Sequence, residues 1–190
     1  MIRHCAGVLA VLLSLTVALP LSAAPVPEEE RIAVDVRRTT LLVRDIERSL
    51  PVYRDALGLT VIYDELLGGG TDDQGNATPP TTRLVLLRAN DTFIGAIGLM
   101  QRLNLPEPVP PPENRRAMPG DVIIVINATD LEERFGRIEA TPGVTVATPP
   151  TRIEYPAPDG GVIPVLFSAF WDPDGYFIEV NRILGTPAGS

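Results

Sequence analysis

Hydrophobic residues along 34–183 follow two periodicities, which alternate in the same order in each half of the chain. Each half begins with a strand-like stretch, continues with a stretch of helical spacing, and ends with three more strand-like stretches. The predicted strands cover 34–43, 60–65, 82–89 and 93–102 in the first half, and 121–128, part of 144–155, 163–171 and 176–183 in the second. The predicted helices cover 44–59 and 129–140. The pattern therefore predicts two βαβββ units.

Capping signals place the ends of the predicted helices. In the first helix Asp45 is expected as the N-cap and Gly58 as the C′ residue. Pro51 lies between them and has no backbone N–H to donate, so it destabilises the helix unless it lies in the first turns or marks a kink. The second helix is expected to open at Thr129 or Asp130.

Glycine and proline mark the connections. The glycine-rich stretch 67–80 predicts a long loop, and the proline-dense stretch 104–120 predicts a connector without periodic structure. In Asp172–Gly175, Pro173 in the second position and Gly175 in the fourth fit a type I turn. This turn is expected to join the last two strands in a hairpin.

The two units have matching spacings. Asp45 and Gly58 are thirteen residues apart, as are Asp130 and Gly143. Each residue of the second pair lies 85 positions after its counterpart in the first pair. Because the order of elements also agrees, the spacings indicate an internal duplication. We expect module one over 34–103, the connector over 104–119 and module two over 120–184.

The first 24 residues are expected to be a secretory signal peptide. Arg3 precedes a long apolar run, and Pro20 with Ala23 and Ala24 suits the end of a signal that is cleaved. An uncleaved membrane anchor is the alternative, because residues 5–24 carry no charge over twenty positions. Cleavage predicts a secreted or periplasmic protein without stable membrane insertion.

Composition excludes several kinds of chemistry. The single histidine and the single cysteine are His4 and Cys5, both inside the expected signal, and the chain has no lysine. The remainder therefore has no thiol nucleophile, imidazole base or Schiff-base amine. The formal net charge is −8 and no basic run is present, which excludes nucleic acid as an expected partner.

Two stretches resemble the motifs that open and close the vicinal oxygen chelate superfamily, which includes glyoxalase I, extradiol dioxygenases and bleomycin-binding proteins. They are "VRDIERSLPVYRDALGLTVIYDE" and "FWDPDGYFIEVNRI", and the resemblance covers roughly 34–184. It implies an α+β fold in which two βαβββ modules in one chain curl around a shared cleft. It does not imply one reaction, since the fold hosts several activities.

The resemblance also implies four positions where strand residues bind a divalent ion in the metal-dependent members. Here these positions hold Arg38, Gly98, Ile123 and Glu179, with the position of Gly98 uncertain by one or two residues. One carboxylate is not a metal site, because a hard or borderline cation needs several oxygen or nitrogen donors. We therefore expect no metal and no other cofactor.

The same strands supply the candidate site. The residues expected to contact a ligand are Arg38, Thr40, Gly98, Ile123, Glu179 and Asn181, and Glu179 is the candidate catalytic residue. Glu179 either acts in the cleft or is a family remnant paired with an arginine. Arg38 points into the cleft, or outward if the strand register slips by one. Our hypothesis is an ion pair between Arg38 and Glu179 in place of a metal.

These observations predict an exported protein that binds a small molecule without a catalytic metal, as a monomer or a homodimer. Two alternatives stay open. One is an exported lyase, isomerase or dioxygenase-like enzyme in which Glu179 is a general base and Arg38 stabilises an oxyanion. The other is a non-catalytic interaction module whose cleft is filled by side chains. The sequence leaves open whether the protein is an enzyme.

Overall fold

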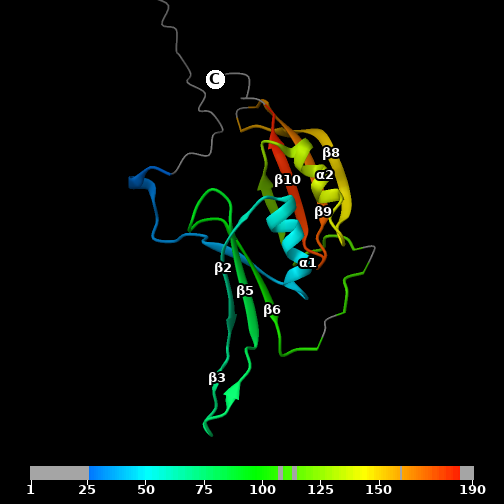
Figure 1. Ribbon diagram of the computed structural model, residues 1–190. Helices are drawn as coiled ribbons and strands as arrows, with labels where there is room; N and C mark the ends of the chain where they lie inside the picture. The colour runs from blue at the N-terminus through cyan, green and yellow to red at the C-terminus, as the bar shows by residue number, and fades with distance from the viewer. Residues whose placement is uncertain (1–25, 107–108, 113–114, 159, 185–190) are drawn as a thin grey trace, which may run out of the picture.

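Two four-stranded sheets, each with a helix on one face, form the framework of the structure (Figure 1). This computed structural model describes residues 26–106, 109–112, 115–158 and 160–184. The expected signal peptide lies outside these residues. Within the described ranges, no helix has the length and apolar character needed to cross a bilayer.

Module one contains a complete βαβββ unit. Its elements are β1 (Arg38–Leu42), α1 (Ile46–Leu50), a π-helical segment (Pro51–Ala56), β2 (Thr60–Leu67), β5 (Thr82–Arg88) and β6 (Ala96–Arg102). A 3₁₀ turn (Glu28–Glu30) precedes the module. Module two repeats the unit with β7 (Ile123–Asn127), α2 (Leu131–Glu139), β8 (Thr145–Pro156), β9 (Val162–Trp171) and β10 (Phe177–Ile183). The predicted order of elements is confirmed.

The two sheets also have the same topology. Their strand orders are β1-β6-β5-β2 and β7-β10-β9-β8, so in each module the first strand pairs with the last and lies at an edge. These first-to-last pairs are parallel, and all other pairs in the two sheets are antiparallel. Thr40 pairs with Gly98 and Val125 pairs with Glu179. Since Thr40 and Val125 are 85 residues apart, Gly98 and Glu179 hold equivalent positions in the duplicated fold.

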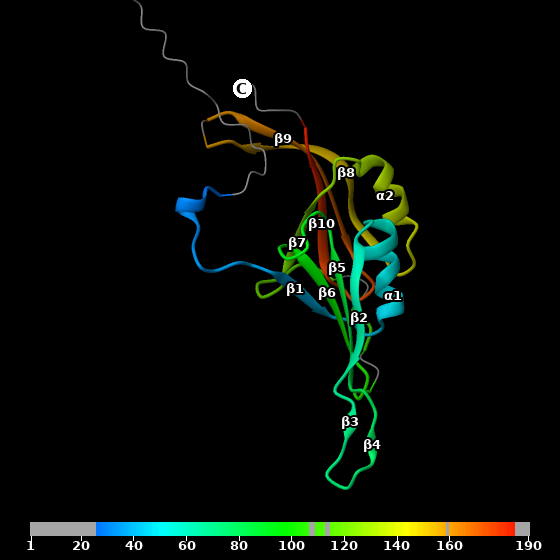
Figure 2. The ribbon, with the colours of Figure 1, turned by 60° about the vertical axis from the view of Figure 1, so that its left-hand side comes forward.

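The structure differs from the sequence prediction at the glycine-rich stretch. Two short strands, β3 (Gly70–Thr71) and β4 (Ala77–Thr78), pair there and extend the β2–β5 hairpin away from the sheet (Figure 2). The turn between them closes on Asp72, whose carboxylate accepts the backbone N–H groups of Gln74 and Asn76. This local hydrogen bonding stabilises a hairpin where the glycines alone indicated a loop.

The type of helix changes at Pro51. The carboxylate of Asp45 accepts the N–H of Glu47 and confirms the expected N-cap. From Pro51 the chain is π-helical, because proline cannot donate the bond that would continue the α-helix. The segment ends at Ala56, and Gly58 follows as the expected C′ residue with a φ of 69°, in the left-handed region that glycine favours. Tyr53 lies in this π-helical segment and is fully buried.

One hydrophobic core lies between the helices and the sheet faces that they cover. Ile46, Leu131, Ile138, Phe170 and Ile178 are fully buried and come from both modules. The second helix also contacts the end of the first, because the Arg134 guanidinium donates to the backbone carbonyl of Leu57 at 2.6 Å. Phe170, which precedes the Asp172–Gly175 turn, also belongs to this core. The modules are consequently one packed unit.

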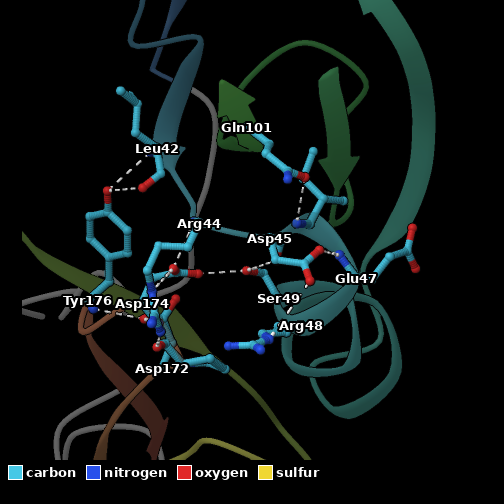
Figure 3. A network of polar contacts seen from close by, with 12 residues as sticks. Leu42, Arg44, Asp45, Glu47, Arg48, Ser49, Gln101, Asp172, Asp174 and Tyr176 are labelled. Atoms are coloured by element: carbon cyan, nitrogen blue, oxygen red, sulfur yellow. Dashed lines mark hydrogen bonds and ion pairs between the residues drawn. The ribbon is translucent and has the colours of Figure 1, made fainter. Parts of the chain in front are cut away.

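Polar contacts join the Asp172–Gly175 turn of module two to α1 of module one (Figure 3). The Tyr53 hydroxyl donates to the Asp172 carboxylate at 2.7 Å, and both groups are buried. The other Asp172 oxygen accepts the N–H groups of Asp174 and Tyr176, and Gly175 donates its N–H to the Asp172 carbonyl as the expected turn requires. Burial raises the pKa of Asp172 to about 6 and the pKa of Tyr53 well above its ordinary value.

A second contact in this turn is a buried ion pair. The Asp174 carboxylate accepts the Arg44 Nε at 3.1 Å, the Arg44 backbone N–H at 2.9 Å and the Ser49 hydroxyl at 2.8 Å. Arg44 also donates to the carbonyl of Pro173. The Asp174 side chain is 3% exposed and that of Arg44 is 13% exposed. Both charges are removed from water, so the loss of either side chain would leave the other as a buried charge without its partner.

Arg44→Ala should lower the free energy of unfolding by ~3–5 kcal/mol, because it leaves a buried carboxylate without its cation. Arg48→Ala is the matched control, since Arg48 is 59% exposed and lies 3.8 Å from Asp45. An exposed pair of this kind contributes at most about 1 kcal/mol. Urea unfolding followed by circular dichroism measures both variants, and losses of equal size would contradict the importance of the buried pair.

Asp172 should make the folded state less stable as the pH rises from about 4 to about 6. Its folded pKa of about 6 exceeds the ordinary value of 3.8, so the folded state binds this proton more tightly than the unfolded state. The full difference corresponds to ~3 kcal/mol. In Asp172→Asn this contribution is absent, so the stability of the native protein relative to the variant should fall between pH 4 and pH 7.

Urea titrations of both proteins at several pH values test this expectation. Asp73→Asn, at an exposed position in the β3–β4 turn, is the control for removing one negative charge. A constant difference in stability between the native protein and Asp172→Asn across this pH range would show that the raised pKa is wrong.

Candidate functional site

A groove lies between the start of β1 in module one and the edge strand β7 in module two. Its volume is about 390 Å³. Apolar side chains form most of its walls, with polar contributions from Arg38, Thr39 and Asn127. The lining residues are Val36, Arg38, Thr39, Leu59, Ala89, Gly95, Ala96, Ile97 and Val122–Asn127. The groove is thus built from both modules, as a shared cleft requires.

The backbone adds hydrogen-bonding groups to this groove. Alternate residues of an edge strand direct their N–H and C=O groups away from the sheet. At the end of β1 the Tyr176 hydroxyl binds both free groups of Leu42, accepting the N–H at 3.1 Å and donating to the carbonyl at 2.9 Å. By the same alternation Arg38 and Thr40 direct backbone groups outward from β1. The first strand of module two has an equivalent free edge, at Ile123 and Val125.

Arg38 crosses the sheet surface beside Gly98. A Cβ atom at Gly98 would lie 3.2 Å from the Arg38 Cδ and 2.9 Å from the Thr40 hydroxyl oxygen. The absence of a side chain at Gly98 therefore leaves the space that Arg38 and Thr40 use. Within the described part of the chain, no ion pair or side-chain hydrogen bond of Arg38 is found.

Glu179 lies half-buried on the face of its sheet opposite the core. Its neighbours Ile178 and Val180 are fully buried on the other face, so the strand alternates as expected. The Asn181 side-chain amide donates to the Glu179 carboxylate at 3.5 Å. This contact joins two residues of the candidate site that are two positions apart on one strand.

The expected ion pair between Arg38 and Glu179 is wrong: both residues are described, and no N–O distance within 4.0 Å joins them. The two residues belong to different sheets. Arg38 extends along its own sheet beside Gly98, and Glu179 contacts Asn181.

The candidate residues therefore fall into two groups. Arg38 and Ile123 line the groove, with Thr40 and Gly98 beside Arg38 on the same sheet. Glu179 and Asn181 contact one another on β10 and are not among the groove residues. Asn127 was missed by the sequence reasoning, although a polar residue at the end of an apolar strand was a usable signal.

The residues at the four family positions do not fit a divalent cation. Arg38 repels one, Gly98 and Ile123 offer no side-chain donor, and Glu179 alone supplies oxygen. In the described ranges no group of three or more histidine, cysteine, aspartate and glutamate side chains is placed to hold a metal ion. The side chains at these four positions supply one cation, on Arg38, and one carboxylate, on Glu179.

Comparisons with known proteins agree with this architecture. A glyoxalase family protein from Bacillus cereus superposes with a TM-score of 0.56 at 11% identity, over 82% of this chain and 98% of that one. Two further structures match with lower scores. A glyoxalase/bleomycin resistance protein/dioxygenase family enzyme from Burkholderia phytofirmans PsJN has a TM-score of 0.49 at 11% identity, over 80% of this chain and 100% of that one. An antibiotic binding protein from Streptomyces sp. CB03234 has a TM-score of 0.47 at 18% identity, over 81% of this chain and 100% of that one.

The first of these structures shows the fold alone, since its identity is low. No curated protein matches the sequence. The family model described as the Glyoxalase/Bleomycin resistance protein/Dioxygenase superfamily matches residues 36–180, which is most of the chain. The match includes both modules, the connector and the turn that joins β9 to β10. This protein belongs to the glyoxalase/bleomycin resistance protein/dioxygenase superfamily.

Proposed function

We propose that this protein binds a small organic molecule in the groove between β1 and β7, without a catalytic metal. The observation that carries the proposal is the groove itself. Its volume of about 390 Å³ and its largely apolar walls suit a small ligand. Family membership leaves binding and catalysis open, because the superfamily includes resistance proteins and dioxygenases.

Arg38 is the group that would orient the ligand. Its guanidinium offers several N–H donors in one plane, which suits a carboxylate or another oxygen-rich group. The outward backbone groups of the two edge strands and the Asn127 amide provide further hydrogen bonds. The proposed ligand therefore combines an apolar body with an acidic or carbonyl oxygen placed against Arg38.

The position of the Glu179 carboxylate favours ligand binding over catalysis by this residue. A general base must reach the proton that it removes, directly or through one water. Glu179 contacts Asn181 and is not among the residues that line the groove. The open groove likewise supports a ligand-binding protein rather than an interaction module with a filled cleft.

We also propose that the protein works outside the cytoplasm, on the basis of its first 24 residues. Fusing these residues to alkaline phosphatase, which is active only after export, tests this in a bacterial host. We expect activity in the periplasm or medium. Activity confined to the membrane fraction would indicate an anchor, and inactive fusions would overturn export.

Arg38→Gln should weaken binding by about tenfold or more, because it removes the cation from the groove. A thermal-shift screen of metabolites and antibiotics identifies ligands, and calorimetry then measures their affinities with and without EDTA. Arg152→Gln is the control, since Arg152 is 61% exposed on the distant strand β8. A requirement for divalent metal, or equal affinities of the native protein and Arg38→Gln, would contradict the proposal.

A further inference from the structure

A second cavity lies under the proline-rich connector, at the opposite end of β1 from Arg38. Its volume is about 330 Å³. Leu42 and Met100, from the ends of β1 and β6, form part of its wall, and Leu105 and Val109 of the connector face them. Because Arg38 and Leu42 are the first and last residues of β1, about 13 Å of strand separates this cavity from the Arg38 end of the groove.

Contacts with the β9–β10 turn hold the connector at this place. A Cβ atom at Gly175 would lie 2.8 Å from the Cβ of Pro111, so the glycine allows a close approach. The Arg115 guanidinium lies 5.2 Å from the centre of the Trp171 ring and donates to Asp121 at 2.7 Å. These contacts position one wall of the cavity before any ligand arrives.

The lining of this cavity is positively charged although the whole chain has a net charge of −8. Three arginines line it, Arg44, Arg102 and Arg115, against one carboxylate, Asp174. Asp174 is neutralised by Arg44, and Arg115 is paired with Asp121, which is not among the residues that line the cavity. In the described part of the chain Arg102 takes part in none of the ion pairs and donates no side-chain hydrogen bond.

We propose that this cavity binds the carboxylate of a small amphipathic organic acid, with Arg102 as its main partner and Arg115 beside it. A carboxylate accepts two parallel hydrogen bonds from a guanidinium, and the apolar walls suit a hydrocarbon or aromatic body. A bare inorganic anion would leave those walls in water. This site is separate from the groove and does not depend on the function proposed for it.

Calorimetry with 2-naphthoate on the purified protein tests the site, with the neutral 2-naphthamide as a matched probe of the same shape. We expect 2-naphthoate to bind at least about tenfold more tightly than the amide, and Arg102→Gln to remove most of that difference. Arg116→Gln removes a neighbouring exposed arginine and should leave the affinity unchanged. In Arg38→Gln, which alters the groove, the part of the affinity that depends on Arg102 should be kept.

The other outcomes overturn the inference. No binding of 2-naphthoate, or equal affinities for the acid and the amide, would show that the arginines do not form an acid site. An affinity that is lost in Arg38→Gln but kept in Arg102→Gln would assign the acid to the groove, which contradicts this inference while supporting the proposed function. Circular dichroism of each variant confirms that the fold is retained.

Discussion

The hydrogen bond from Tyr53 to Asp172 is a buried polar contact between two modules whose sheets are not joined by strand pairing. Asp172 is 2% exposed and ionises unfavourably in this environment, so its neighbours must supply hydrogen bonds. The Tyr53 hydroxyl and two backbone N–H groups do so. Tyr53 reaches this position from the π-helical segment that Pro51 starts. The π-helical segment of module one thus contacts the Asp172–Gly175 turn of module two through Tyr53.

This junction determines where the two proposed ligand-binding surfaces lie. The same turn binds Arg44 through Asp174, and its next residue, Tyr176, binds the free edge of β1 at Leu42. The edge of β1 is therefore bound at one end and open at the other, where the groove with Arg38 begins. The connector rests on the same turn and covers the second cavity. Loosening the turn would disturb both surfaces.

Local signals in the sequence predicted the features that depend on residues close together in the chain, namely the strands, the helices and the helix ends. Strand and helix periodicity predicted both βαβββ units, and Asp45 and Gly58 predicted the limits of the first helix. The hairpin β3–β4 was missed, because its stability comes from the hydrogen bonds of Asp72 rather than from an apolar pattern.

Contacts between modules were not predictable in the same way. Family positions suggested that Arg38 meets Glu179, but proximity around a metal in relatives does not transfer to a chain with different side chains. The partner of Glu179 is Asn181, and the buried acids pair with Tyr53 and Arg44. Such pairs depend on how the two sheets approach one another, which no periodicity encodes. The acids of the Asp172–Gly175 turn were visible in the sequence, while their partners 119 to 130 residues away were not.

Native-state hydrogen exchange tests most directly whether the junction makes the modules one cooperative unit. The slowest amides of β5 in module one and β9 in module two should exchange with the same opening free energy. Tyr53→Phe leaves the buried Asp172 without one donor and should lower both values equally, by ~1–3 kcal/mol. Different opening free energies for the two strands, or a loss confined to one module in Tyr53→Phe, would contradict the account.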